Sequence, residues 1–193
     1  MVESAEEAAI AAPKTPALRA AQARIVAASL ELFARHGVGG TSLQMIADAV
    51  GVTKAAVYFQ FRTKDEIVLA AAEDELARLE AVVDAAEAET SRARRRDVLL
   101  VRIVDLSVDR RRTVNVILSD PVVLRFFADH ARYRKVIDRI DDLLIGTGTG
   151  SDGHLQTAMF MAAISGAVMH PMVAEFDDET LRSQLLKLVR RFR

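Results

Sequence analysis

The stretch from Thr41 to Lys64, TSLQMIADAVGVTKAAVYFQFRTK, constrains the fold of this chain more than any other. Apolar residues at positions i, i+3, i+4 and i+7 predict one buried helical face, formed by Leu43, Ile46, Ala47 and Val50. Thr41, followed by Gln44, has the spacing of a capping box at the start of that helix. Gly51 has the backbone freedom that a sharp stop requires, and Thr53 is placed to cap a second short helix.

Two short helices joined by a tight turn are typical of a helix-turn-helix, here over about residues 42–61. The second helix of such a motif enters the major groove of DNA. Val57 and Phe61 are expected to face inward, whereas the opposite side carries small or hydrogen-bonding residues: Thr53, Lys54, Ala55, Tyr58 and Gln60. An alternative without DNA makes Thr53 only a cap, Tyr58 a core aromatic and Lys54 a solvated charge.

The two kinds of DNA contact predict different roles for these side chains. Phosphate contacts fix the register of a protein on DNA, whereas contacts with base edges give sequence specificity. The hydroxyl groups placed for phosphate belong to Thr41, Ser42, Thr53 and Tyr58. Gln44 and Lys54 are long enough to hydrogen-bond bases, and Ala55 is small enough to touch a thymine methyl group.

The charge distribution changes sign at the end of this motif. Residues 14–64 hold seven basic and two acidic side chains, a net charge of +5, although the whole chain has a net charge of −1. Residues 65–90 hold one basic and nine acidic side chains, a net charge of −8. A basic head before an acidic stretch favours a local DNA contact. An ordinary mixture of solvated faces is the alternative.

The residues from Ile25 to Leu69 resemble the TetR (tetracycline-repressor-like) family of bacterial transcriptional regulators. The matching pieces are Leu32-Phe33, His36-Gly37, Thr41-Ser42, Ile46-Ala47, Ala49 to Thr53, Tyr58 to Phe61, and Lys64 to Glu66. This resemblance covers the N-terminal quarter of the chain and implies backbone contacts with DNA by Thr41, Thr53, Tyr58 and Lys64. Gln60 departs from the family pattern, which often has histidine or tyrosine there.

These patterns predict an all-α protein of two parts behind a loose N-terminal tail at residues 1–16. Residues 17–64 are expected to form a three-helix DNA-binding domain, whose first helix runs to His36 and ends at Gly37 in a left-handed cap. Residues 65–193 are expected to be helical, and the family resemblance implies that they form a domain for effector binding and dimerisation. Within it we expect a helix from about Thr63 to Ala88, a short segment before Pro121, a helix over residues 121–144, a loop at residues 146–153, and helices over residues 152–169 and 177–192.

The last two of these helices carry more apolar residues than one small domain needs, which suggests association. The family resemblance implies a homodimer through these two helices, packed as a four-helix bundle; the alternative is that both are internal. The resemblance also implies a small-molecule effector among the middle helices. Candidate pocket residues are Val101, Phe126, Phe127, Tyr133, Met159 and His170, which suggest an apolar or aromatic effector. Plain core packing is the alternative for each.

The sequence carries no signature of catalysis, of a metal site or of a cofactor site. It has no cysteine, and its four histidines lack the spacing of a helical metal site. It also lacks an 18-residue apolar run and a basic leader, so we expect a cytoplasmic protein without a membrane span. Together with these patterns, the family resemblance implies a ligand-responsive transcriptional repressor that binds a near-palindromic double-stranded operator. A helical adaptor that binds another protein is the alternative.

Overall fold

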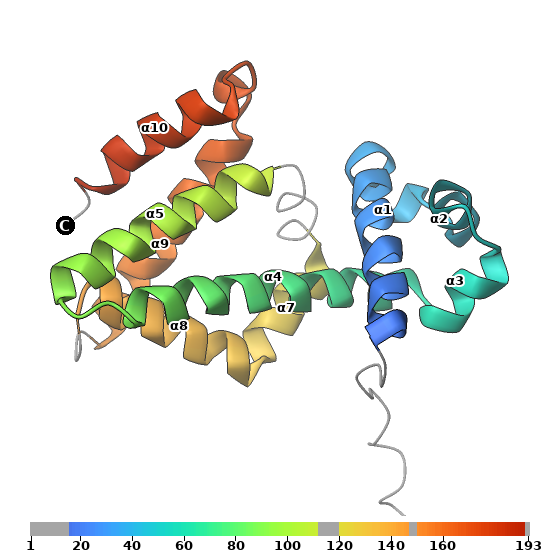
Figure 1. Ribbon diagram of the computed structural model, residues 1–193, viewed down its shortest axis with the longest axis horizontal. Coiled ribbons are helices and arrows are strands. Elements are labelled where there is room, and N and C mark those ends of the chain that lie inside the picture. The colour runs from blue at the N-terminus through green and yellow to red at the C-terminus, as the bar shows by residue number, and fades with distance from the viewer. Residues whose placement is uncertain (1–15, 112–119, 147–149, 192–193) are drawn as a thin grey trace, which may run out of the picture. The chain divides into compact units, whose positions relative to one another are not determined.

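The computed structural model describes residues 16–111, 120–146 and 150–191, and every regular element in these ranges is a helix (Figure 1). The prediction of an all-α protein is therefore confirmed. No helix in the described ranges has both the length and the apolar character needed to cross a bilayer. Most of the predicted tail lies outside these ranges, while its last residue, Pro16, begins the first helix.

The chain divides into two compact units, Met1–Ile67 and Val68–Arg193. The first unit contains α1 (Pro16–Gly40), α2 (Leu43–Val50), α3 (Lys54–Gln60) and the first residues of α4 (Lys64–Glu87). The second contains the rest of α4 together with α5 (Arg92–Asp109), α7 (Pro121–Asp129), α8 (Ala131–Leu144), α9 (Gly150–Met169), the short 3-10 helix η1 (Pro171–Val173) and α10 (Asp178–Val189).

A glycine interrupts α1 near its C-terminus. Gly37 has φ 71° and ψ 161°, a combination that is essentially restricted to glycine. The sequence correctly placed a positive φ here, but the expected left-handed cap is wrong because ψ is extended. The chain instead makes one further turn to Gly40, and this turn leads directly to α2.

The first unit has a small apolar core made by all of its helices. Its buried large side chains are Ile25, Leu30, Phe33, Ile46, Val57, Phe61 and Ile67. The expected inward orientation of Val57 and Phe61 is confirmed, with 0% and 5% of their surfaces exposed. α2 packs against both α1 and α3, so its position fixes that of α3.

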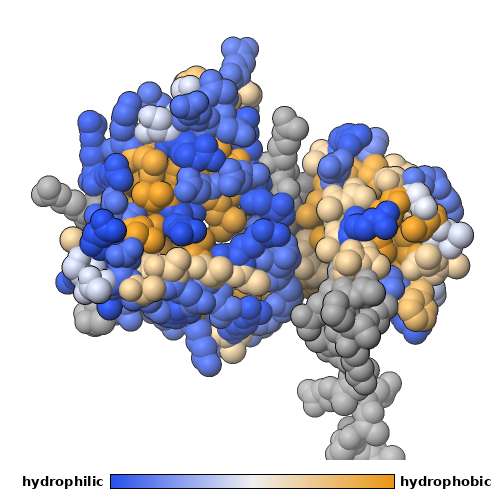
Figure 2. Space-filling view, in the orientation of Figure 1, coloured by the Kyte–Doolittle hydropathy of each residue, from blue (hydrophilic) through white to orange (hydrophobic). Residues whose placement is uncertain are grey.

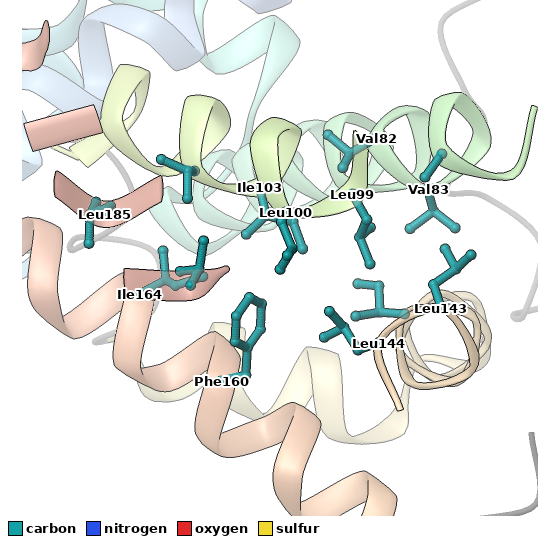
Figure 3. Close-up of a cluster of buried hydrophobic side chains, with 14 of the residues drawn as sticks. Val82, Val83, Leu99, Leu100, Ile103, Leu143, Leu144, Phe160, Ile164 and Leu185 are labelled. Carbon is teal, nitrogen blue, oxygen red and sulfur yellow. The ribbon is translucent and has the colours of Figure 1, made fainter. Parts of the chain in front are cut away.

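The second unit is built around a larger apolar core to which α4, α5, α8, α9 and α10 all contribute (Figure 3). Val83, Leu99 and Ile140 in it are completely buried. Figure 3 shows Phe160 and Ile164 of α9 pointing toward Leu100 and Ile103 of α5. In Figure 2 apolar residues also reach the visible surface of this unit, between hydrophilic margins.

Two expected elements of the second unit are wrong. The helix expected over residues 121–144 is broken at His130, whose φ of −82° and ψ of 110° are extended, so α7 and α8 are separate. The loop expected at residues 146–153 is shorter, because α9 already begins at Gly150. Residues 147–149, and residues 112–119 of the short segment expected before Pro121, lie outside the described ranges, as does Phe192 of the last predicted helix.

Ion pairs join α4 to α8 along one side of the second unit. Arg132 contacts Glu73 at 3.3 Å and also binds Glu80, and Arg139 contacts Asp84 and Glu87, each at 2.6 Å. Hydrogen bonds from Arg132 to Glu80 and from Arg139 to Glu87 lower the pKa of both glutamates. These contacts attach α8 to the acidic helix that the sequence places after the basic head.

Candidate nucleic-acid interface

Ser42 is the N-cap of α2, the first helix of the predicted helix-turn-helix. Ser42 Oγ accepts a hydrogen bond from the Met45 backbone N–H at 3.2 Å. The expected capping box of Thr41 and Gln44 is therefore wrong. Gln44 donates its side-chain amide to Asp48 at 2.7 Å, one turn along the exposed face of α2.

Thr41 lies inside the first unit and not on its surface. Only 2% of it is exposed, and its hydroxyl donates to the Gly37 carbonyl at 2.9 Å. Lys64 is half-buried beside it, and its ammonium donates to the backbone carbonyls of Val38, Gly39 and Thr41. Thr41 and Lys64, two of the four residues that the family resemblance assigns to the DNA backbone, are thus hydrogen-bonded to the end of α1 and the residue after it.

The turn between α2 and α3 has the geometry that its sequence predicts. Gly51 is left-handed, with φ 77° and ψ 37°, and its N–H donates to the Ala47 and Asp48 carbonyls. Thr53 caps α3, since its hydroxyl accepts from the Ala56 N–H at 3.1 Å. A defined turn with capped ends holds the short helix α3 in a fixed direction on α2.

α3 presents a continuous exposed face made of the predicted contact residues. Thr53, Lys54 and Ala55 are exposed, and Tyr58 is 52% exposed. Gln60 is half-buried near the end of the helix. Phe59, which was not among the predicted contacts, is 81% exposed beside Tyr58. Phe59 therefore lies on the exposed surface of α3 and is not part of the apolar core.

Arg24 has a partner that the sequence did not suggest. Its Nη2 donates to the Val50 carbonyl at 3.2 Å, at the C-terminal end of α2. A cation at a helix C-terminus also interacts favourably with the helix dipole. Arg24 therefore attaches α1 to the end of α2.

The predicted effector residues divide into two groups in the second unit. Phe126, Phe127 and Tyr133 form a ring cluster, with centroids 5.5 Å apart for the first pair and 4.5 Å apart for the stacked second pair. Burial raises the pKa of Tyr133. The other three lie on α5, on α9 and just after α9: Val101 is half-buried, Met159 is 61% exposed, and His170 is exposed, with Nδ1 accepting from the Met172 N–H.

His130, which is not among the predicted pocket residues, lies beside the ring cluster. Its ring lies 4.5 Å from that of Phe126, and its Nε2 lies 3.1 Å from a carboxylate oxygen of Glu73. The other ring nitrogen, Nδ1, is buried and has no hydrogen-bond partner among the described residues. Buried polar atoms are seldom left unpaired. The role of His130 could not be predicted, because the sequence predicted an unbroken helix through this position.

Comparison with known sequences finds a family model that matches most of the described part of the first unit. Residues 25–71 match the family model for bacterial regulatory proteins of the tetR family. The uncharacterized HTH-type transcriptional regulator YerO of Bacillus subtilis is 40% identical over 50 residues, which are 26% of this chain and 17% of YerO. The probable acrEF/envCD operon repressor of Escherichia coli is 39% identical over 54 residues, which are 28% of this chain and 24% of that repressor. The chain thus spans about a fifth of the length of these curated relatives.

Comparison with solved structures extends the similarity in fold to nearly the whole chain. A tetR-family regulatory protein from Rhodococcus RHA1 superposes with a TM-score of 0.71 at 21% identity, covering 89% of this chain and 96% of that one. AibR, in complex with isovaleryl coenzyme A and operator DNA, gives 0.68 at 17% identity, covering 87% and 97%. FadR of Bacillus subtilis, in complex with stearoyl-CoA, gives 0.66 at 15% identity, covering 89% and 98%. Residues 25–71 are thus similar to the tetR family of bacterial regulatory proteins, and the fold of the chain is similar to that of solved tetR-family regulators.

Proposed function

We propose that this chain is a DNA-binding transcriptional regulator, with residues 17–64 as the reading domain and residues 65–193 as the effector-binding and dimerisation domain. The exposed face of α3 is the observation that carries this proposal. α3 is capped by Thr53 and anchored by the completely buried Val57, yet it leaves Lys54 and Tyr58 open to solvent. A rigid, surface-mounted helix with hydrogen-bonding groups on its outer side is suited to the major groove.

The burial of Thr41 and the hydrogen bonds of Lys64 narrow the proposed contact set to seven residues. These are Ser42, Gln44, Thr53, Lys54, Ala55, Tyr58 and Gln60. We infer that the hydroxyls of Ser42, Thr53 and Tyr58 meet phosphates, and that Gln44 and Lys54 reach base edges. A correct base contact of this kind contributes about 1–3 kcal/mol of discrimination.

We infer that the regulator acts as a homodimer through α9 and α10. Apolar side chains on these helices remain open to water in the single chain: Leu155 and Leu188 are each 62% exposed and Met159 is 61% exposed. Ala162, Ala163 and Gly166 are also exposed and small enough to let another helix approach closely. Exposed apolar surface of this kind favours a protein partner, and a two-fold dimer matches a near-palindromic operator.

We infer that a small apolar or aromatic molecule binds in the second unit and releases the operator, so that the regulator is a repressor. The ring cluster of Phe126, Phe127 and Tyr133 supplies an apolar contact. His130 Nδ1, which has no hydrogen-bond partner among the described residues, supplies a polar one. Beside His130 lies an open hollow of about 800 Å³ lined partly by Lys135 and Arg139. Two proteins of this fold carry acyl-CoA molecules, so acyl-CoA thioesters are the first effectors to test.

We infer that the chain acts in the cytoplasm and is not an enzyme. No group of three or more possible metal-ligating side chains occurs among the described residues. The curated relatives of its first unit include an HTH-type transcriptional regulator and an operon repressor. A protein-binding adaptor remains the rival function, and it differs from the proposal in requiring no DNA.

Selection of genomic fragments by the purified protein tests the proposal. We expect enrichment of fragments that share a near-palindromic site, and much weaker enrichment by the variant Lys54→Ala. Arg78→Ala serves as a matched control, because Arg78 is exposed but pairs with Asp74 in the second unit. Enrichment of no common site, with or without acyl-CoA present, would favour the adaptor.

A further inference from the structure

Three backbone carbonyls between α1 and α2 converge on a single ammonium group. Lys64 Nζ lies 2.6 Å from the Val38 oxygen, 3.2 Å from the Gly39 oxygen and 2.8 Å from the Thr41 oxygen. These carbonyls belong to the turn that follows Gly37 and to the residue before Ser42, the N-cap of α2. An ammonium has three N–H donors, so all the donors of Lys64 are used inside the first unit.

We propose that Lys64 is a positioning residue that fixes the start of α2, and that it does not contact a phosphate. The proposal rests on the proposed function, because it concerns how the reading helices are held for DNA. A phosphate contact by Lys64 would require it to give up at least one of its three carbonyls. The contacts with Val38 and Thr41 are partly buried, so the loss of either would leave a partly buried carbonyl without its charged donor, which is unfavourable.

At the C-terminal end of α2, Arg24 can be compared with Lys64, because it also donates to a backbone carbonyl. Its guanidinium donates to the Val50 carbonyl, so cationic side chains hold the backbone on both sides of α2. A guanidinium has five N–H donors, and one bond to a carbonyl leaves others for solvent or phosphate. The ammonium of Lys64 has none left, so its contribution to DNA binding must be indirect.

The indirect contribution passes through α2 to α3. α2 packs on α1 and on α3, and Ile46 and Ala47 of α2 are completely buried. If the start of α2 is free to move, the exposed face of α3 is no longer held in one direction. DNA binding must then order it again, which lowers the affinity without changing the number of phosphate contacts.

Salt dependence separates this role from a phosphate contact. The logarithm of the binding constant falls with the logarithm of salt concentration, with a slope of roughly −0.9 for each phosphate neutralised. We would measure binding to the selected operator over a salt series for the parent, Lys64→Met, Lys64→Arg and Lys54→Met. Lys54 is the matched control, since it is an exposed lysine in the same unit.

For Lys64→Met we expect about tenfold weaker binding at every salt concentration and an unchanged slope, because a hydrogen bond to a charged group contributes about this factor. For Lys54→Met we expect the slope to become shallower, by at most roughly 0.9 per protomer, because an exposed ammonium in the DNA interface also neutralises phosphate charge when it hydrogen-bonds a base. Lys64→Arg should not restore binding, since a planar guanidinium does not match three carbonyls gathered around one point. A shallower slope for Lys64→Met, or parent-like binding by Lys64→Arg, would overturn the proposal.

Two measurements keep the proposal separate from the proposed function and from misfolding. Without DNA, the backbone amides of Met45 and Ile46, which bond to Ser42, should exchange faster in Lys64→Met than in the parent. Unchanged exchange would overturn the proposal even if the parent binds no DNA. If Lys64→Met does not fold, the ammonium NMR signal of Lys64 in the parent tests the proposal instead. We expect this signal to stay unchanged when operator is added. A shift as large as that of the Lys54 signal would overturn the proposal.

Discussion

Neighbouring side chains of the same chemical type have different roles in the first unit. Thr41 and Ser42 both carry a hydroxyl, but Thr41 is buried against Gly37 and Ser42 is exposed as the cap of α2. Lys54 and Lys64 both carry an ammonium, but only Lys54 is exposed. At the scale of single residues, the exposure of a side chain, and not its chemical type alone, decides whether it is available to DNA.

Gly51 can be tested by comparing the same substitution at two glycines. A Cβ at Gly51 or at Gly39 meets no heavy atom within 4 Å, but Gly51 alone of the two has a positive φ, of 77°. Gly51→Ala should therefore lower the free energy of unfolding by about 1–2 kcal/mol through conformational strain. Gly39→Ala should be neutral or raise it by about 0.4–1 kcal/mol. Equal effects in urea unfolding would contradict the assigned turn geometry.

Among the proposed contact residues, Tyr58 and Lys54 can be substituted with the least expected effect on the fold. Tyr58→Phe removes only the hydroxyl of a 52% exposed side chain, and Lys54→Ala removes an exposed charge. Each should weaken operator binding about fivefold or more, because each removes a hydrogen bond to a charged or polar group of DNA. Circular dichroism should show unchanged helix content. Parent-like binding by both variants would mean that α3 does not contact the operator.

The sequence predicted those residues of the site whose roles depend on local geometry. Gly51 and Thr53 were recognised because a left-handed stop and an N-cap require particular residue types at particular places. The internal roles of Thr41 and Lys64 depend on where the last carbonyls of α1 lie, 23 or more residues from Lys64. That placement is set by tertiary packing, which one sequence does not display.

At the scale of elements, the arginines of α8 match the acids of α4 in spacing. Arg132 and Arg139 are seven residues apart, as are Glu73 and Glu80, so both helices repeat after about two turns. Arg139→Met breaks two contacts with α4 and should cost about 1 kcal/mol of unfolding free energy. The exposed pair of Arg35 and Glu31 is the control, and Arg35→Met should cost at most about 0.5 kcal/mol. Equal costs in urea unfolding would show that α8 does not depend on these contacts.

The same ion pairs predict that the thermal stability of the protein depends on pH in the acidic range. The pKa values of Glu80 and Glu87 are lowered from 4.5 in the folded protein, mainly by hydrogen bonds from Arg132 and Arg139. A lowered folded pKa stabilises the fold fully above the ordinary glutamate pKa, and this stabilisation is lost as the pH falls through the folded value. The melting temperature should therefore fall below about pH 4.5 by more in the parent than in a double variant, Arg132→Met with Arg139→Met. An equal fall would contradict the contribution of these pairs.

The sequence predicted the boundaries of elements well where a residue type enforces them. Pro121 begins α7 and Asp177 caps α10, as expected from the sequence. The break at His130 was missed because no glycine or proline lies near it and the apolar periodicity continues through it. His130 instead contacts Glu73 and Phe126, which are tertiary neighbours, and these contacts accompany the extended conformation at the break.

At the scale of the whole molecule, the proposed dimer makes a prediction about solution mass. Met159 on α9 is 61% exposed and Leu124 on α7 is 54% exposed, so arginine at either position should leave the fold intact. Met159→Arg should dissociate the dimer, because it places a charge in the proposed α9–α10 interface. Leu124→Arg should leave the dimer unchanged. Sedimentation equilibrium distinguishes the two, and equal masses for both variants would contradict the proposed interface.

DNA reading by α3 is the central claim, and footprinting of the selected operator at two salt concentrations tests it most directly. We expect two protected half-sites related by two-fold symmetry, with centres about 10 base pairs apart or a multiple of that distance. Protection should weaken steeply at the higher salt concentration, and Lys54→Ala should weaken it at the lower one. The claim would be contradicted if no site is protected. It would also be contradicted if protection is the same at both salt concentrations and is not weakened by Lys54→Ala.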